Sequence, residues 1–285
     1  MKMKPFELVC GKYKISLGKK TSIMGILNVT PDSFSDGGKF DSFENAISHA
    51  KQMIEDGAGI IDIGGESTRP FADPVSADDE AKRVVPVIEK LAAEISVPIS
   101  IDTSKASVAK KAIEAGASIV NDVSAMRDSD MPGVIKESGL PVILMHMKGN
   151  PSTMQIRPEY DDAVTEIKDY LKDAVERSVS FGIDRSKIVV DPGIGFGKSI
   201  EHNLAIIKRF DEFLETGVPV LLGSSRKSFI QKILGIDSPE DSIAETGTQA
   251  TVAAAVLKGA HIVRVHNVKG TKATIDIIDS IRNVG

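Results

Sequence analysis

The sequence predicts an α/β fold, a (β/α)8 TIM barrel that begins with a short N-terminal β-hairpin. Three observations support this prediction: short apolar runs recur along the chain, segments with helical spacing separate them, and the runs number eight. Strands that alternate with helices pair in parallel through crossovers, and eight repeats over 285 residues favour a closed barrel. Because periodicity does not show closure, an open, doubly wound sheet is the alternative.

Each apolar run is short and rich in Ile, Val or Leu, which is typical of strands buried on both faces. The runs cover 22–29, 59–65, 98–104, 118–124, 141–147, 188–194, 218–225 and 261–268. Ahead of them, residues 6–9 and 13–17 are typical of two short strands around Cys10 and Gly11. These two segments predict the hairpin.

The segments between the runs carry apolar residues at three- and four-residue spacing, which predicts helices. They cover 42–56, 77–95, 105–115, 160–181, 200–215, 241–258 and 271–282, with a weaker one at 126–139. Glycines such as Gly57 and Gly182 follow the predicted helix ends, where a left-handed residue is favoured. No linker or change in composition divides the chain. We therefore expect one domain over 1–285, with the hairpin in 1–20 and the barrel in 21–285.

The composition excludes several classes of protein. Apolar residues make up 41% of the chain, enough for a large core, and the net charge of −5 argues against a general nucleic-acid binder. The single cysteine, Cys10, fits a reducing compartment and is expected to be a buried thiol. The first residues lack the apolar stretch of a signal peptide, and no run is long enough to span a bilayer. We expect a cytoplasmic protein without nucleic-acid or membrane partners.

Polar or charged residues stand at the end of each predicted strand. A single aspartate after a strand most often turns the chain or caps the next helix, so each residue alone has an ordinary structural explanation. In a barrel, however, the carboxyl ends of all strands meet at one mouth, which holds the active site. The residues in question are Asn28, Asp62, Asp102, Asn121, His146, Asp191, Lys227 with Ser228, and Arg264 with His266.

The stretch 188–199, IVVDPGIGFGKS, looks like a phosphate-binding loop but matches no such motif. A P-loop needs a glycine five residues before Gly197, where this chain has Pro192. The dinucleotide-binding pattern needs its third glycine where this chain has Lys198. The glycines still indicate a tight turn that approaches a ligand closely. What this stretch does predict is a strand with Asp191 at its carboxyl end.

The strand-end residues divide into two chemical groups. Asp102, Asn121 and Asp191 are rich in acceptors, and they suit a flat heterocycle whose exocyclic amine and ring N–H form two parallel donors. Arg69, Lys227, Arg264 and His266 suit phosphate and carboxylate groups. The predicted ligand is a heterocycle linked to a phosphate, together with a second acid.

The histidine positions argue against a zinc hydrolase. The first strand ends in Asn28 and carries no His-x-His pair, and only His146 and His266 lie near strand ends. A hard cation such as Mg²⁺, held by phosphate oxygens and one or two protein oxygens, is more plausible.

At these positions the sequence closely resembles the dihydropteroate synthase family of pterin-binding barrel enzymes. The matching stretches are MGILNVTPDSFSDGG (24–38), DIGGESTRP (62–70), ISIDTS (99–104), IVNDVSA (119–125), MHMKGNPSTMQ (145–155), DPGIGFGK (191–198), GSSRKSFI (223–230) and RVHNV (264–268). They follow the predicted strands in order and span nearly the whole barrel.

The resemblance implies that the chain condenses 6-hydroxymethyl-7,8-dihydropterin diphosphate with 4-aminobenzoate to give 7,8-dihydropteroate and diphosphate. It implies Mg²⁺ as cofactor, small-molecule substrates, sulfonamide drugs as inhibitors and a homodimer formed through outer helices. No strong nucleophile or general base stands out in the sequence. We therefore expect the carbon–oxygen bond to break first, with an SN1-like loss of diphosphate, before the weak aniline nucleophile attacks.

The resemblance also assigns residues. The pterin site would consist of Asp102, Asn121, Met145, Asp191, Lys227 and Arg264. The diphosphate would contact Asn28, Thr68, Arg69, Arg264 and His266, with Asn28 also binding the metal. The aminobenzoate would contact Phe34, Arg69, Pro70, Phe196 and Ser228. Asp102, Lys227, Arg264 and His266 are the expected catalytic residues.

The chain departs from the family pattern at two positions. Phe71 replaces a frequent glycine after STRP, and Asn267 replaces a usual aspartate after Arg264–His266. Three alternative functions remain. A pterin-dependent methyltransferase would keep the acceptor trio but would not need the Arg264–His266 anion site. A pterin-binding barrel without turnover would bind pterin diphosphate and release nothing. A metal hydrolase of the same fold fits least well.

Overall fold

The computed structural model describes residues 3–29, 39–67, 74–149, 158–239 and 241–284. Its strands are β1 (Phe6–Cys10), β2 (Tyr13–Leu17), β3 (Ser22–Asn28), β4 (Ile60–Gly64), β5 (Ile99–Asp102), β6 (Ile119–Asp122), β7 (Val142–Met145), β8 (Ile188–Asp191), β9 (Leu221–Leu222) and β10 (Ile262–Val265). Its α-helices are α1 (Lys39–Glu55), α2 (Ala77–Glu94), α3 (Ala106–Glu114), α4 (Met131–Ser138), α5 (Ala163–Phe181), α6 (Ile200–Lys208), α7 (Ser228–Leu234), α8 (Ser242–Leu257) and α9 (Val268–Asn283). Two 3₁₀ helices are η2 (Arg185–Lys187) and η3 (Phe210–Thr216).

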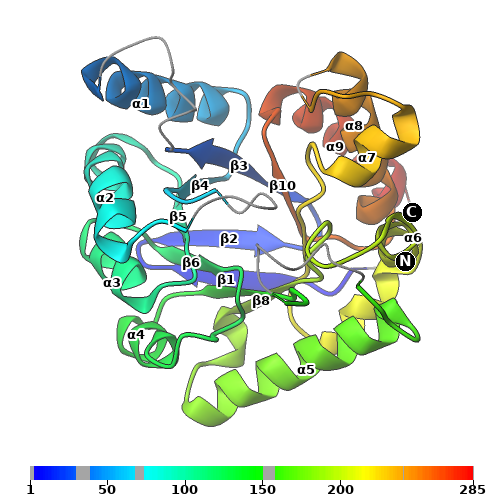
Figure 1. Ribbon diagram of the computed structural model, residues 1–285, viewed down its shortest axis with the longest axis horizontal. Coiled ribbons are helices and arrows are strands. Elements are labelled where there is room, and N and C mark those ends of the chain that lie inside the picture. The colour runs from blue at the N-terminus through cyan, green and yellow to red at the C-terminus, as the bar shows by residue number, and fades with distance from the viewer. Residues whose placement is uncertain (1–2, 30–38, 68–73, 150–157, 240, 285) are drawn as a thin grey trace.

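The eight strands β3 to β10 form a parallel barrel. Their order in the sheet is β8-β7-β6-β5-β4-β3-β10-β9. A parallel bridge between Val190 and Val220 joins the two ends, and the Val190 N–H donates to the Pro219 carbonyl at 3.0 Å. The predicted barrel is therefore confirmed, and the open sheet is excluded. Figure 1 shows the helices around the outside of the strands.

The antiparallel β1–β2 hairpin closes the amino-terminal end of the barrel. Leu8, Cys10 and Leu17 of the hairpin are buried against apolar side chains of the barrel interior. Those interior side chains are Met24, Ile60, Ile119, Ile143, Val189, Leu221 and Ile262. The hairpin runs across the strand ends in Figure 1. Cys10 is the predicted buried free thiol, and burial raises its pKa to about 12.

The larger part of the core lies between the outer faces of the strands and the helices. Helix α2 illustrates how the sequence builds this layer, because its buried residues Val84, Ile88 and Leu91 recur at three- and four-residue spacing. Ser76 caps this helix by accepting from the Asp79 N–H, and three acidic residues occupy its first turn. Among the described residues, no helix combines the length and apolar character that a bilayer span requires.

Two helical segments differ from the prediction. The segment 200–215 divides at Arg209 into α6 and η3, because Arg209 lies outside the helical region at φ −111° and ψ 29°. The short helix α7 was not predicted. Strand β9 contains only two residues of the predicted run 218–225, and on its amino-terminal side Pro219 has no N–H to extend the ladder.

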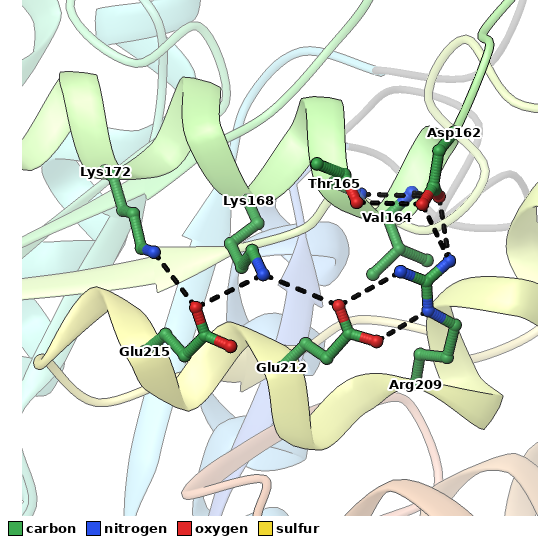
Figure 2. A network of polar contacts seen from close by, with 8 residues as sticks. All are labelled: Asp162, Val164, Thr165, Lys168, Lys172, Arg209, Glu212 and Glu215. Atoms are coloured by element: carbon green, nitrogen blue, oxygen red, sulfur yellow. Dashed lines mark hydrogen bonds and ion pairs between the residues drawn. The ribbon is translucent and has the colours of Figure 1, made fainter.

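A chain of surface ion pairs joins α5 to η3, as Figure 2 shows. The Arg209 guanidinium binds the N-cap residue of α5, Asp162, at 2.8 Å and Glu212 at 2.6 Å. Lys168 then bridges Glu212 and Glu215, at 3.5 and 3.2 Å. These contacts tie the helix that follows β7 to the segment that follows β8, and these two strands lie next to each other in the barrel.

Candidate active site at the carboxyl ends of the strands

Strand alternation explains why polar residues line the carboxyl end of the barrel. Side chains two positions apart on a strand point to the same side. The residues two positions after the inward-facing apolar side chains therefore also point inward, one layer nearer the mouth. Four pairs follow this rule: Ile60 and Asp62, Ile119 and Asn121, Val189 and Asp191, and Ile262 and Arg264.

Arg264 lies between two carboxylates at the centre of this layer. Its Nε donates to Asp62 Oδ2 at 2.5 Å, and its Nη2 donates to Asp102 Oδ2 at 2.6 Å. Burial acts to lower the pKa of Arg264, but the two carboxylates outweigh burial and raise it. The guanidinium is therefore a fixed cation. Since two of its nitrogens are held by different strands, its plane is set before any ligand binds.

Asp102 combines this ion pair with an unsatisfied oxygen. Burial raises the pKa of Asp102 to about 7, against the opposing effect of the Arg264 charge. Its Oδ1 is buried and has no hydrogen-bond partner among the described residues. A buried acceptor without a partner is costly unless a ligand or water supplies a donor. Asp102 is therefore suited to accept a hydrogen bond from a bound ligand.

Asp62 orients Asn121 as well as Arg264. Asn121 Nδ2 donates to Asp62 Oδ2 at 3.1 Å, and Asn121 is only 4% exposed. Because the amide nitrogen is held by Asp62, the Asn121 side chain presents its Oδ1 as an acceptor elsewhere. The sequence placed Asp62 at a strand end but gave it no role. Its position two residues after inward-facing Ile60 is the signal that could have found it.

Asp191 is held at the end of β8 by the backbone of the glycine-rich turn. Its Oδ1 accepts from the Gly193 N–H at 2.7 Å, and its side chain is almost fully buried. Burial raises the pKa of Asp191 to about 6, although this hydrogen bond and the Lys227 charge oppose the rise. The carboxylate is thus fixed in direction and is desolvated, as a site for two parallel donors requires.

Lys227 follows β9, which lies next to β8 in the closed barrel, and its ammonium lies over an aromatic ring. Its Nζ is 3.9 Å from the ring centroid of Phe196. Burial and the Arg264 charge lower the pKa of Lys227 to about 8, while Asp191 and Asp102 act in the opposite direction. Gly195, at φ 83°, gives the lysine stem its space, because a Cβ there would lie 3.0 Å from Lys227 Cδ.

His266 is positioned by Ser225. The Ser225 hydroxyl lies 2.9 Å from His266 Nδ1 and also accepts from the His266 backbone N–H at 3.2 Å. The sequence did not single out Ser225 for this role. The departure at Asn267 has a structural explanation, since Asn267 caps α9 by accepting from the Gly270 N–H at 2.9 Å.

The remaining predicted residues fall into three groups. Met145 and Phe196 form an apolar cluster with Val123 and Met147 at the mouth. Asn28 ends β3 and Ser228 begins α7, and both are exposed. Phe34, Thr68, Arg69, Pro70 and Phe71 lie outside the described residues.

Asn28 is the predicted metal ligand, and its chemistry fits Mg²⁺. It supplies one amide oxygen beside Gly64 of β4, where an added Cβ would lie 3.8 Å from Asn28 Oδ1. Mg²⁺ accepts such an oxygen together with phosphate oxygens and waters. In the part of the chain that the structure describes, no three His, Cys, Asp or Glu residues form a metal-binding group. A zinc or binuclear hydrolase centre is therefore not supported by these residues.

The comparisons with known proteins agree with this geometry. The family model for pterin binding enzymes matches residues 24–266, most of the chain. A dihydropteroate synthase of Bacillus subtilis is 49% identical over 274 residues, covering 95% of this chain and 92% of that protein. The chain belongs to the dihydropteroate synthase family.

Solved structures of this family superpose on the whole barrel. The dihydropteroate synthase of Xanthomonas albilineans with 4-aminobenzoic acid is 38% identical, with a TM-score of 0.92, covering 99% of this chain and 100% of that one. The Yersinia pestis dihydropteroate synthase with a sulfonamide drug complex is 41% identical, with a TM-score of 0.91, covering 98% and 100%. The barrel with its added hairpin is therefore the family fold.

Proposed function

We propose that this protein catalyses the condensation of 6-hydroxymethyl-7,8-dihydropterin diphosphate with 4-aminobenzoate, which yields 7,8-dihydropteroate and diphosphate. The observation that carries the proposal is the layer formed by Asp102, Asn121, Asp191 and Arg264 at one barrel mouth. It offers buried acceptors for a flat ring beside a fixed cation. Family membership supports the same reaction in folate biosynthesis and makes the chain a transferase.

We assign the pterin ring to the buried acceptors. Asp191 would accept from the exocyclic amine and the adjacent ring N–H, with Asn121 Oδ1 and Asp102 Oδ1 accepting from the remaining donors. Arg264 would lie against one face of the ring. Met145 would pack against the ring, and Lys227 would donate to it.

The diphosphate would be bound at the rim, next to the pterin ring. Arg264 and His266 would donate to its oxygens, and Thr68 and Arg69 are the further residues that the sequence assigns to it. Asn28 would hold Mg²⁺ together with the diphosphate oxygens. When bound, the metal would offset the charge that grows on the leaving group.

The order of bond changes follows from the residues at the mouth. Ser225 contacts His266 at the mouth, but its hydroxyl also accepts from the His266 backbone N–H, so we assign it to positioning His266 and not to nucleophilic attack. The aniline amine is itself a weak nucleophile. We infer that the bond between the methylene carbon and the diphosphate oxygen breaks first. Its electron pair leaves with diphosphate, and the dihydropterin ring delocalises the resulting positive charge. The buried Asp102 carboxylate favours that charge, and the amine then attacks the carbon and loses a proton.

The aminobenzoate would enter beside Phe196 and Ser228, with Phe34, Arg69 and Pro70 assigned from the sequence. Phe196 offers an apolar ring edge next to the Lys227 ammonium, which suits an aromatic acid. The Yersinia pestis relative was solved with a sulfonamide drug complex, and we propose that such drugs also compete for this pocket.

We further propose that two copies associate through α6, α7 and α8, which lie together on one side of the barrel in Figure 1. Large exposed apolar side chains gather on these helices: Leu204, Ile233, Leu234 and Ile243 are 41–52% exposed. Such residues are candidates for burial in a dimer. We place the enzyme in the cytoplasm, where a lone thiol such as Cys10 stays reduced.

A direct assay tests the function. The purified protein, mixed with pterin diphosphate, 4-aminobenzoate and Mg²⁺, should form dihydropteroate and release one diphosphate for each product molecule. A pterin-dependent methyltransferase would form no dihydropteroate, and a binding protein without turnover would bind pterin diphosphate and release no diphosphate. Either result would overturn the proposal.

A further inference from the structure

Lys198 is a buried lysine that the proposed chemistry does not use. It follows the glycine-rich turn after β8, and it is only 3% exposed. Its Nζ lies 2.9 Å from the Phe196 carbonyl, 3.0 Å from His146 Nδ1 and 3.5 Å from the His146 carbonyl. Within the described ranges no carboxylate oxygen forms an ion pair with it. The side chain therefore points into the protein, so it cannot serve as the lysine of a phosphate-binding loop.

The three neighbouring atoms match the three donors of an ammonium group. When Lys198 is charged it has donors and no acceptor, so His146 Nδ1 is then the acceptor and we assign the ring proton to Nε2. Burial lowers the pKa of His146 to about 2, which keeps the imidazole neutral as this arrangement requires. The ring also packs edge-on against Tyr170, with 4.9 Å between the centroids.

The turn that Lys198 holds is packed closely against the end of β7. A Cβ on Gly193 would lie 2.0 Å from the His146 carbonyl oxygen, and one on Gly197 would lie 2.6 Å from the Lys148 carbonyl oxygen. The Tyr160 hydroxyl adds a hydrogen bond to the Gly197 carbonyl at 3.0 Å. The backbone on both sides of Phe196 is therefore fixed by polar contacts.

A buried ammonium that makes no direct ion pair is costly, and burial lowers the pKa of Lys198 to about 7 although the Asp191 charge opposes this. An apolar residue of similar length would avoid this cost. The lysine instead directs its donors to His146, which follows β7, and to the Phe196 carbonyl. Its hydrogen bond to the Phe196 carbonyl helps to fix the position of the Phe196 backbone.

We propose that Lys198 is a positioning residue for the aminobenzoate pocket, because it joins the Phe196 backbone to the end of β7. This inference rests on the proposed role of Phe196. The Phe196 ring must stay against Lys227 for an aromatic acid to be bound beside this pair, and the Lys198 contacts supply that constraint.

The same geometry predicts that the pterin site depends less on Lys198. Asp191 has two backbone contacts that do not use the Lys198 side chain, since its Oδ1 accepts from the Gly193 N–H and its carbonyl accepts from the His146 N–H at 2.9 Å. Loss of the Lys198 contacts should therefore affect the two substrates unequally.

The test compares Lys198→Met with Lys187→Met. Lys187 provides a matched control, because its Nζ also donates to a backbone carbonyl, that of Val9 at 2.6 Å, but at the opposite end of β8. In Lys198→Met, the KM for 4-aminobenzoate should rise by about 10- to 100-fold, since a displaced pocket wall misplaces the second substrate. Calorimetric affinity for pterin diphosphate should change by less than about threefold. Lys187→Met should leave both values at the wild-type level.

Equal losses for both substrates in Lys198→Met, or an unchanged aminobenzoate KM, would overturn the inference. If Lys198→Met fails to fold, Tyr160→Phe removes another contact to this turn, the one to the Gly197 carbonyl, and should raise the same KM by a smaller factor. An unchanged KM in that variant would also overturn it. A wild-type protein that makes no dihydropteroate would instead contradict the proposed function, so the two failures are distinguishable.

Discussion

At the scale of single residues, Asp62 orients more of the site than its position in the sequence suggests, because it contacts two other site residues. One oxygen of this fully buried carboxylate accepts from both Arg264 and Asn121. It thereby fixes the plane of a cation and the direction of an amide, the two features that a flat ligand would meet. Preorganised groups of this kind lower the cost of ordering the site when a ligand binds.

Asp62→Asn should lower kcat/KM for pterin diphosphate by about 10- to 100-fold, since an amide no longer pairs with the guanidinium and can turn its nitrogen toward Asn121. Steady-state kinetics at saturating aminobenzoate measure this effect. Ser100→Ala is the control, because the Ser100 hydroxyl is also buried in the barrel but has no partner among the described residues. Similar kinetics in the two variants would show that Asp62 has no positioning role.

The raised pKa of Asp191 predicts a pH dependence of pterin binding. Burial raises this pKa to about 6, so the carboxyl is protonated below that pH and cannot accept two donors. Affinity should therefore rise with pH, by up to about tenfold per unit below pH 6, and level off above it. Asp102, with a pKa of about 7, extends the rise toward neutral pH. Arg264 stays charged throughout, and Lys227, with a pKa of about 8, stays mostly charged up to pH 7. Calorimetry from pH 5 to 8 that finds constant affinity would contradict this assignment.

At the scale of elements, a partly buried ion triad holds the segment after β4. Lys105 Nζ lies 2.7 Å from Glu66 and 2.5 Å from Glu80, and Glu80 is fully buried in the first turn of α2. The other oxygen of Glu66 accepts from the Val75 N–H at 2.8 Å. Glu66 thus joins the two described ends of the β4–α2 connection, and Lys105 ties them to the start of α3.

Lys105→Met should destabilise the fold by about 3 to 5 kcal/mol, because it leaves the Glu80 charge buried without a partner. Lys111→Met is the matched control, since Lys111 pairs with Asp78 at 3.0 Å across the same two helices but in solvent. Its loss should cost less than about 1 kcal/mol. Urea unfolding measures both variants, and adding Glu80→Gln to Lys105→Met should restore part of the loss. Equal small effects in both single variants would contradict the argument.

The elements that the sequence predicted well are those whose burial repeats along the chain. Burial on both faces marks the strands, and one-sided burial marks α2 and α5, so these were found with small boundary errors. The break at Arg209 was not predicted because Phe210 and Phe213, both buried, are three residues apart, a spacing that fits an α-helix and a 3₁₀ helix equally. Helix α7 spans less than two full turns and shows no period.

The sequence predicted those features of the site that depend only on barrel topology. Strand ends converge whatever their order in the chain, so Asp102, Asn121, Asp191 and Arg264 could be placed at one mouth. The pairings could not be predicted, because they depend on register and on which rotamer reaches across the barrel. Asp62 with Asn121, Ser225 with His266 and Lys198 with His146 all join residues more than forty positions apart.

At the scale of the whole molecule, the amino-terminal end of the barrel stabilises the fold and the carboxyl end forms the site. The hairpin and a layer of apolar side chains fill the amino-terminal end. The polar layer packs against this apolar layer. Because the amino-terminal end is tightly packed, charged side chains can be buried at the carboxyl end of the barrel. The outer helices are available for contacts with a second copy of the chain.

Sedimentation velocity tests the proposed dimer. The wild-type protein should sediment as a dimer at micromolar concentration, and Ile233→Asp should shift it toward the monomer, because a charge in an apolar contact is costly. Phe181→Asp is the control, since Phe181 is comparably exposed, at 47% against 52% for Ile233, but lies at the end of α5. A monomeric wild type, or equal shifts in both variants, would argue against the α6–α8 face.

A crystal structure with a bound dihydropterin is the most direct test of the central claim, that one flat ring is bound by the buried acceptors of three different strands. We predict ring donors within about 3.2 Å of the Asp191 carboxylate and of Asn121 Oδ1, with the Arg264 guanidinium against the ring face. A ring bound elsewhere on the barrel, or one in the mouth that contacts neither Asp191 nor Asn121, would contradict it.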